Sequence, residues 1–182
     1  MAESFNPARI PAMWVNQVLN REHDDVRFEA FANEVATVLE GAPVVGTSKS
    51  WDLGRDGRAL GERQGTFVLT TLRTDSDKAK EDATRLKSKA RKIRHVYYVA
   101  PRVTSEAVLE AHCEDIRAIV GEDVVVDPLG GPQLEDLVAG GKAAEAFRQH
   151  YAGPETEALS LQVSLVAGAR NPLNLEFSWT VA

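Results

Sequence analysis

The spacing of apolar residues predicts two helices in the first forty positions. Residues 11–22 and 24–39 carry apolar side chains three or four positions apart, as expected of helices buried on one face. In the second segment either Asp24 or Asp25 is a suitable N-cap, and Gly41 is a suitable stop. The apolar stripe expected to face the core there consists of Phe28, Phe31, Val35, Val38 and Leu39.

The middle of the chain alternates between short β-branched runs and segments of helical period. The expected strands are 43–46, 50–53, 66–72, 95–100 and 123–126, with a turn signal at 54–57. The expected helices are 76–92, 105–120, 132–138 and 142–151. This alternation is typical of an α/β sheet with helices on both faces. We expect the strands before residue 76 to form an antiparallel hairpin or meander.

The apolar faces of the two central helices differ in kind. The segment 76–92 has a narrow stripe of mostly small residues, which lets a helix lie close to a sheet: Ala79, Ala83, Leu86, Ala90 and Ile93. The segment 105–120 has a larger stripe: Leu109, Cys113, Ile116 and Val120. Because no partner set of a nucleophilic site accompanies His112 and Cys113, we expect both to be core residues.

The last residues follow a different pattern. Two period-2 runs, 159–165 and 173–181, flank the turn segment AGARNP and predict an amphipathic β-hairpin. A lone hairpin is marginally stable in water and must pack on something. We therefore expect an α/β domain over 1–154 and an appendage over 155–182. That appendage is interpreted as a small addition, a contact for a homodimer or larger assembly, or the start of a further domain.

Composition narrows the class of protein. Of 182 residues, 43% are apolar and 26% are charged, which is enough apolar material to fold. The single Cys113 excludes an internal disulfide and a cysteine-based zinc site. No apolar run is long enough to cross a bilayer and no signal peptide is visible, so we expect a cytoplasmic protein with no membrane partner.

The net charge of −6 conceals a basic middle. Residues 55–102 contain 13 Lys and Arg against 6 Asp and Glu, a local balance of +7 that leaves −13 for the rest. A basic stretch in an acidic protein indicates an anionic partner such as nucleic acid. The alternative is a lysine-rich helix that simply presents a solvated face.

Residues 48–58, Ser-Lys-Ser-Trp-Asp-Leu-Gly-Arg-Asp-Gly-Arg, form the densest polar cluster. Asp52 and Asp56 carry the carboxylate oxygens that a hard cation such as Mg²⁺ prefers, and Arg55 and Arg58 are suited to phosphate. The alternative interpretation is structural, because Asp56-Gly57 is a favoured hairpin turn whatever the function.

The order of these features resembles the restriction-endonuclease-like (PD-(D/E)xK) superfamily, in particular its Mrr-type branch. The resemblance covers residues 26–102 and rests on short motifs: the Phe28-Glu29 pair, the segment 50–57 as a form of Gly-x-Asp-x-x-x-Asp-Gly with Ser50 in the glycine place, and the strand 66–72. It implies a mixed central sheet flanked by helices and Mg²⁺-dependent phosphodiester hydrolysis. Asp56 matches the metal-binding aspartate, Asp52 the earlier aspartate, and Glu29, or alternatively Glu34, the acid of the first helix.

The sequence departs from that pattern at the end of the strand, where the family has Gln/Glu-x-Lys. If Thr71 takes the Gln/Glu place, Arg73 takes the lysine place, and if Thr70 does, Leu72 follows. Threonine is a poor substitute for a carboxylate, and arginine is a poor proton carrier because it stays protonated. Lys78 or Lys80 on the next helix are the alternative sources of positive charge.

Three hypotheses follow. The first is a DNA-engaging domain of a prokaryotic defence-type protein, possessing a divergent Mg²⁺-dependent nuclease site. In it one helix face tracks the DNA backbone through Lys78, Arg85, Lys89 and Lys92. The second is a catalytically inactive nuclease-fold module for interaction and assembly, favoured by the missing Glu-x-Lys. The third, a small-molecule-binding domain, lacks a glycine-rich nucleotide motif.

Overall fold

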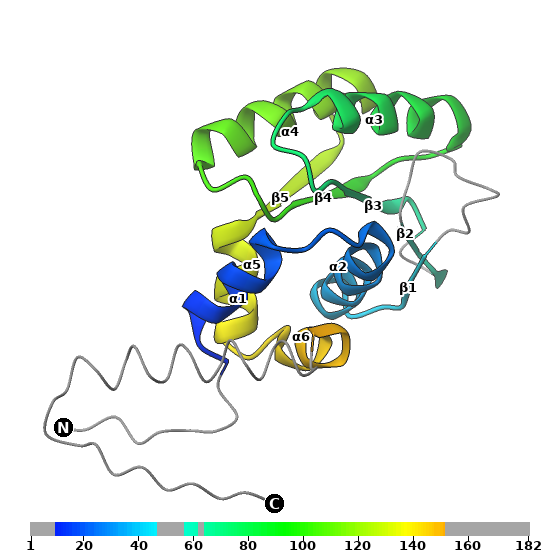
Figure 1. Cartoon of the computed structure of the whole chain (residues 1–182). Helices are drawn as coiled ribbons and strands as arrows, with labels where there is room; N and C mark the ends of the chain where they lie inside the picture. The colour runs from blue at the N-terminus through cyan, green and yellow to red at the C-terminus, as the bar shows by residue number, and fades with distance from the viewer. Residues whose placement is uncertain (1–9, 47–56, 62–63, 152–182) are drawn as a thin grey trace, which may run out of the picture.

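A five-stranded mixed sheet with helices on both faces forms the protein in the computed structural model (Figure 1), which describes residues 10–46, 57–61 and 64–151. The strands are β1 (Val44–Gly46), β2 (Gly57–Ala59), β3 (Thr66–Thr70), β4 (His95–Ala100) and β5 (Val125–Gly130). The helices are α1 (Ala12–Asn20), α2 (Asp25–Glu40), α3 (Asp77–Lys89), α4 (Glu106–Val120), α5 (Gly131–Ala139) and α6 (Ala144–Tyr151). The predicted α/β class is confirmed.

The strands lie in chain order, β1 to β5. β1, β2 and β3 are antiparallel, so they form the predicted meander, whereas β3, β4 and β5 are parallel and are connected through α3 and α4. In Figure 1, α3 and α4 cover one face of the sheet, and α1, α2, α5 and α6 cover the other. The parallel strands β3, β4 and β5 therefore all end on one side of the sheet, which we call the carboxyl edge. They all begin on the opposite side, which we call the amino edge.

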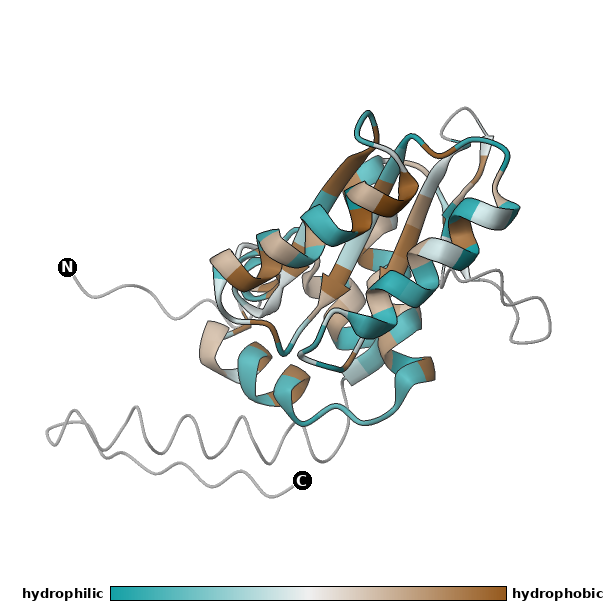
Figure 2. Cartoon of the chain, turned by 90° about the horizontal axis from the view of Figure 1, so that it is seen from above, coloured by the Kyte–Doolittle hydropathy of each residue, from teal (hydrophilic) through white to brown (hydrophobic). Residues whose placement is uncertain are grey.

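Each face of the sheet has its own core. Val68, Tyr97 and Val99 pack with α1, α2, α5 and α6, while Phe67, Leu69, Val96 and Tyr98 pack with α3 and α4. This alternation follows from the period of two along each strand. Seen from above (Figure 2), the strands between α3 and α4 are largely hydrophobic and α3 carries long hydrophilic stretches.

Most predicted element bounds are close to those observed. Asp24 is the N-cap of α2, accepting hydrogen bonds from the N–H groups of Val26 and Arg27. Gly41 ends that helix in the left-handed region with φ of 64°, and β4 has the predicted bounds. The inward residues predicted for α4 are buried, as are His112 and Cys113.

Several expectations were wrong. Val38 is 47% exposed, so it does not belong to the buried stripe of α2. α3 ends at Lys89, so Lys92 lies beyond the helix, since the chain becomes extended at Ala90 before turning back into β4. β5 continues past residue 126 to Gly130. The strand at 57–59 was not predicted, because its glycine suggested only a turn.

The predicted strand at 50–53 and the predicted hairpin at 155–182 lie outside the described residues, as does the boundary at 154. Among the described helices, none combines the length and apolar character that crossing a bilayer requires.

Candidate active site at the carboxyl edge of the sheet

Two contacts fix the direction of α2 relative to the sheet. At its end, the Glu40 carboxylate accepts a hydrogen bond of 3.0 Å from the Tyr97 hydroxyl, near the start of β4. Before its start, the carbonyl oxygen of Glu22 accepts one of 2.6 Å from Arg102, which follows the end of β4. The helix therefore runs antiparallel to β4, and its amino-terminal half, including Glu29, lies toward the carboxyl edge.

The contact between Asn33 and Gly57 brings α2 against the start of β2. A Cβ built on Gly57 would lie 1.8 Å from Oδ1 of Asn33, so only glycine leaves room for this side chain. Glu29 lies four residues before Asn33 and hence on the same face, one turn nearer the carboxyl edge. Glu29 is half-buried. The Glu29 side chain of α2 is thus directed toward the side of the sheet where β2 begins.

The end of β3 reaches the same edge. Thr70 is 5% exposed and shares the α2 face with Val68, two residues earlier. Leu72 packs against the same core cluster. Thr71 belongs to the opposite face, and its hydroxyl accepts a hydrogen bond of 3.0 Å from the Arg73 backbone N–H. The end of β3 therefore presents Thr70 and Leu72 on the Glu29 side, and these are the residues of one of the two alignments expected from the sequence.

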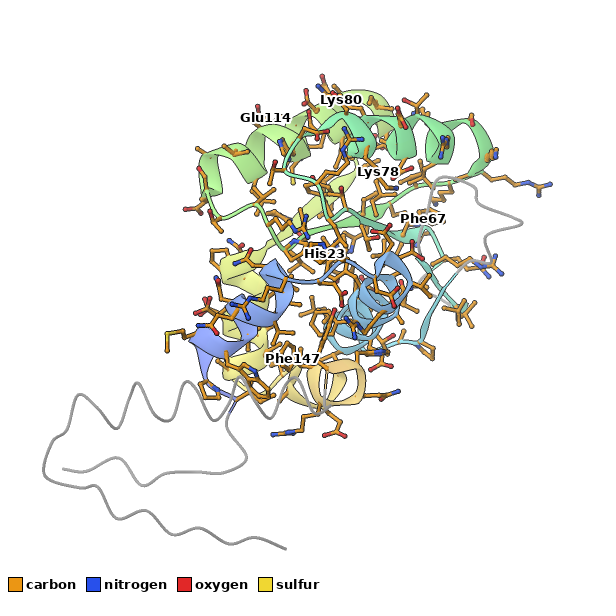
Figure 3. The ribbon with its side chains drawn as sticks, viewed as in Figure 1. His23, Phe67, Lys78, Lys80, Glu114 and Phe147 are labelled. Atoms are coloured by element: carbon orange, nitrogen blue, oxygen red, sulfur yellow. The ribbon has the colours of Figure 1, made fainter. Side chains whose placement is uncertain are left out.

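Acidic partners hold the cations proposed for phosphate near this edge. Arg73 is exposed and its Nε donates to Asp75 at 3.0 Å. Lys78 Nζ lies 2.7 Å from the buried Asp82, on its own helix. Figure 3 places Lys78 and Lys80 on the α3 side of the sheet and His23 on the other side.

Lys80 makes an ion pair across helices. Its Nζ lies 2.9 Å from the Asp115 carboxylate of α4, and this hydrogen bond raises the pKa of the Lys80 ammonium above its usual 10.5. The same bond lowers the pKa of Asp115. Lys80 is therefore a fixed positive charge at neutral pH and not a proton carrier.

The remaining sequence-predicted residues fall in three places. Asp52, Arg55 and Asp56 lie outside the described residues. Glu34 of α2 is the alternative to Glu29. Its carboxylate lies 2.9 Å from Nε2 of His150, so it pairs with α6 and not with β2. The other cations proposed for nucleic acid lie along α3 or toward the amino edge: Arg58, Arg85, Lys89 and Lys92.

A buried ion pair supports the α2 end of the site. Glu22 is 1% exposed, and its carboxylate accepts two hydrogen bonds from Arg27, at 2.7 and 2.9 Å, and two more from the backbone N–H groups of His23 and Asp24. Burial alone would raise the pKa of Glu22, but the bonds from Arg27 and Asp24 outweigh it and hold the pKa below 4.5. This pair fixes the corner between α1 and α2.

Sequence reasoning did not anticipate the cross-link made by His95. Its Nδ1 lies 3.0 Å from Glu40 and its Nε2 lies 2.9 Å from Asp127, so the ring joins α2, β4 and β5 at the amino edge. Both nitrogens face carboxylates, which leaves neither for a metal or a substrate proton. The register that places Tyr97 beside Asp127 could not be inferred from the one-dimensional pattern.

The buried Cys113 thiol and Tyr98 phenol, in the core between α4 and β4, are not activated for catalysis. The Tyr98 hydroxyl is 3.1 Å from Nδ1 of His112 inside the core. Burial raises the pKa of the Cys113 thiol to about 12. Burial also raises the pKa of the Tyr98 phenol. Both groups therefore stay protonated at neutral pH, and Cys113 is the core residue that the sequence predicted.

The oxygen donors at the carboxyl edge suit Mg²⁺ in kind. On the Glu29 face, the described residues offer the Glu29 carboxylate and the Thr70 hydroxyl, and no group of three metal-binding side chains occurs among the described residues. One carboxylate supplies too little negative charge for a hard dication, so a second from the preceding segment is required. Asp56 immediately precedes Gly57 and is the candidate for it.

Comparison with protein-family models, with curated proteins and with solved structures finds no match to this chain.

Proposed function

We propose that the chain is a restriction-endonuclease-like domain that engages DNA and hydrolyses phosphodiesters with Mg²⁺ at a divergent site on the carboxyl edge. The proposal draws on the fold order of helix, three-stranded meander, helix and parallel strand. The proposal includes the assignment of the observed α/β architecture to the restriction-endonuclease-like fold. A place in a prokaryotic defence system is part of the same proposal.

One observation carries the proposal. Asn33 of α2 packs on Gly57 of β2. Glu29 lies one turn before Asn33 on the same helix, on the side nearer the carboxyl edge. Because β2 is antiparallel to β3, with Gly57 opposite Val68, β2 begins at the end nearer the carboxyl edge. The described start of β2, Gly57, is therefore on the side toward which Glu29 is directed. We propose that Asp56, the residue before Gly57 in the sequence, supplies the second carboxylate there.

Each residue has a distinct role in this account. Asp56 and Glu29, assisted by Asp52, would hold Mg²⁺, which supplies a Lewis acid for the phosphate and an activated water. Arg73 follows β3, and Lys78 and Lys80 lie on the first turn of α3. These three residues would add positive charge near a phosphate at this edge, although Asp75, Asp82 and Asp115 partly balance them. Thr70 fills the strand position on the Glu29 face with a neutral oxygen.

A second function, a catalytically inactive interaction module, is favoured by two specific contacts. Leu72 packs into the core at the position where a lysine would face the metal. Lys78 and Lys80 are bound to Asp82 and Asp115. Such a module would retain the fold and bind DNA or a second copy of the chain without cleavage.

Plasmid cleavage with Mg²⁺ or Mn²⁺ separates the two functions. We expect linear or nicked product from the wild-type chain, and a loss of the rate on the order of 10²–10³-fold in Asp56→Ala and Glu29→Gln, because each removes charge stabilisation at the phosphate. Glu34→Gln is the matched control on the same helix and retains the rate. Cleavage that persists in Asp56→Ala excludes this site, and no cleavage by any variant favours the inactive module.

A further inference from the structure

Four cations at the amino edge of the sheet differ from those along α3. Arg58, Arg91, Lys92 and Arg94 are exposed, and within the described residues no ion pair involves them. We call these four residues the basic edge. Lys78, Lys80 and Arg85 are instead balanced by carboxylates. Within the described residues, three of these four cations therefore lie where α3 ends and β4 begins, and the fourth, Arg58, lies on β2.

The sheet brings Arg58 and Arg94 onto the same face. Arg94 donates its backbone N–H to Gly65 before β3, and its Cγ lies 3.3 Å from where a Gly65 Cβ would be. Arg58 is opposite Phe67, which packs on the α3 side of the sheet. One strand separates β2 from β4, so the two arginines stand about 10 Å apart across the sheet.

Three residues of the basic edge, Arg91, Lys92 and Arg94, are separated from the carboxyl-edge site by the length of α3. α3 begins near the carboxyl edge, after β3, and ends near the amino edge, before β4. Its 13 residues span about 20 Å. The contacts of these three residues can therefore be altered without touching Glu29 or the end of β3, whereas Arg58 is two residues from Asp56 in the sequence.

We propose that the basic edge is a contact surface for the phosphate backbone of duplex DNA. The choice of DNA rests on the proposed function, while the surface itself rests on charge and exposure. Three of the four side chains are arginines, whose planar guanidinium binds phosphate oxygens in pairs. The exposed large apolar residues of the described chain include no aromatic residue, whereas membrane-surface elements combine basic residues with Trp or Phe.

A salt titration of duplex binding tests the proposal. A fluorescent duplex is titrated with the full chain in EDTA, so that cleavage plays no part, at NaCl concentrations from about 50 to 200 mM. The test variant is Arg91→Gln/Lys92→Gln/Arg94→Gln. The matched control is Arg117→Gln/Lys142→Gln/Arg148→Gln, which removes the same charge from exposed or half-exposed positions on α4, α6 and the α5–α6 loop. Circular dichroism verifies that both variants are folded.

We expect the test variant to bind at least about tenfold more weakly and to lose about 2 to 3 from the salt slope, close to 0.9 for each phosphate contact. The control should retain both. Equal losses in the two variants overturn the proposal, because net charge alone then explains binding. Failure of the wild-type chain to bind the duplex also overturns it, as does binding of phosphatidylserine vesicles alone.

Failure of this proposal is distinguishable from failure of the proposed function. Duplex binding that depends on the basic edge, without plasmid cleavage under Mg²⁺, supports the surface and rejects the nuclease. Cleavage that requires Asp56, with binding indifferent to the basic edge, does the reverse. If the triple variant is not folded, Arg58→Gln on β2 gives an independent test, for which the expected loss is about 0.9 in slope.

Discussion

Replacing Arg27 by Met tests the buried ion pair that holds the α2 end of the candidate site. In the wild-type chain the Glu22 side chain is fully buried, whereas that of Arg27 is 46% exposed. Arg27→Met keeps the stem beside the Tyr151 ring, 5.3 Å from the guanidinium carbon in the native chain, but removes two of the four donors to the carboxylate. Breaking a buried pair costs about 3–5 kcal/mol. The partial exposure of Arg27 reduces the expected cost to about 2–4 kcal/mol.

The assay is urea or thermal unfolding followed by circular dichroism. For a chain of this size we expect Tm to fall by about 6–12 °C for a loss of about 3 kcal/mol. The matched control is Arg148→Met, whose partner Glu145 is 86% exposed and whose loss should stay below about 1 kcal/mol. Equal effects of the two substitutions would refute the reasoning, because burial would then make no difference.

The effect should also depend on pH with a definite sign. Because the folded pKa of Glu22 lies below 4.5, its stabilisation is present above pH 4.5 and is lost as the pH falls through the folded pKa. The difference in unfolding free energy between wild type and Arg27→Met should therefore be full at pH 7 and shrink below pH 4.5. A difference that grows as the pH falls contradicts this assignment.

Three further predictions follow from single contacts. Gly57→Ala should lower the unfolding free energy by about 1–3 kcal/mol, because the new Cβ would meet Asn33. Adding Asn33→Ala should recover part of this loss in a double-mutant cycle, whereas additive losses would contradict the contact. Cys113, whose pKa burial raises to about 12, should not react with a thiol reagent at pH 8 until urea unfolds the chain, and rapid native labelling contradicts its burial. Lys87→Met removes a hydrogen bond of 2.6 Å to the carbonyl oxygen of Val120 at the end of α4 and should cost about 1 kcal/mol in urea unfolding; an unchanged midpoint contradicts it.

The sequence allowed the layers to be predicted because helices and buried strands carry strong periods. β4 and the inward face of α4 followed directly from β-branched and apolar spacing. β2 could not be predicted from the sequence, because Gly57 has no side chain to contribute to a strand pattern. Glycine is required at this position by the contact with Asn33, 24 positions away. That contact is tertiary, and no local pattern records it.

Charge pairing was the second feature beyond the reach of the sequence. Lys78, Arg85, Lys89 and Lys92 were expected to form one face toward DNA, but Asp82 balances Lys78 and Arg85. Asp115 balances Lys80, the other proposed source of positive charge. The pair of Lys78 and Asp82 is four residues apart and could have been anticipated from helical spacing. The Asp115 pair depends on how α3 and α4 pack, as does the position of Lys92 beyond the end of α3.

The central claim is that the carboxylates of Glu29 and Asp56 meet at the carboxyl edge of the sheet. The most direct measurement is a crystal structure of the chain soaked with Mn²⁺, with the metal located by anomalous scattering. The account predicts a peak bound by both residues, with their nearest oxygens about 3 to 4 Å apart, as expected for cis or trans ligands at a metal–oxygen distance of roughly 2.1 Å. An Asp56 carboxylate on the opposite face of the sheet from Glu29, with no metal peak beside either, would contradict it.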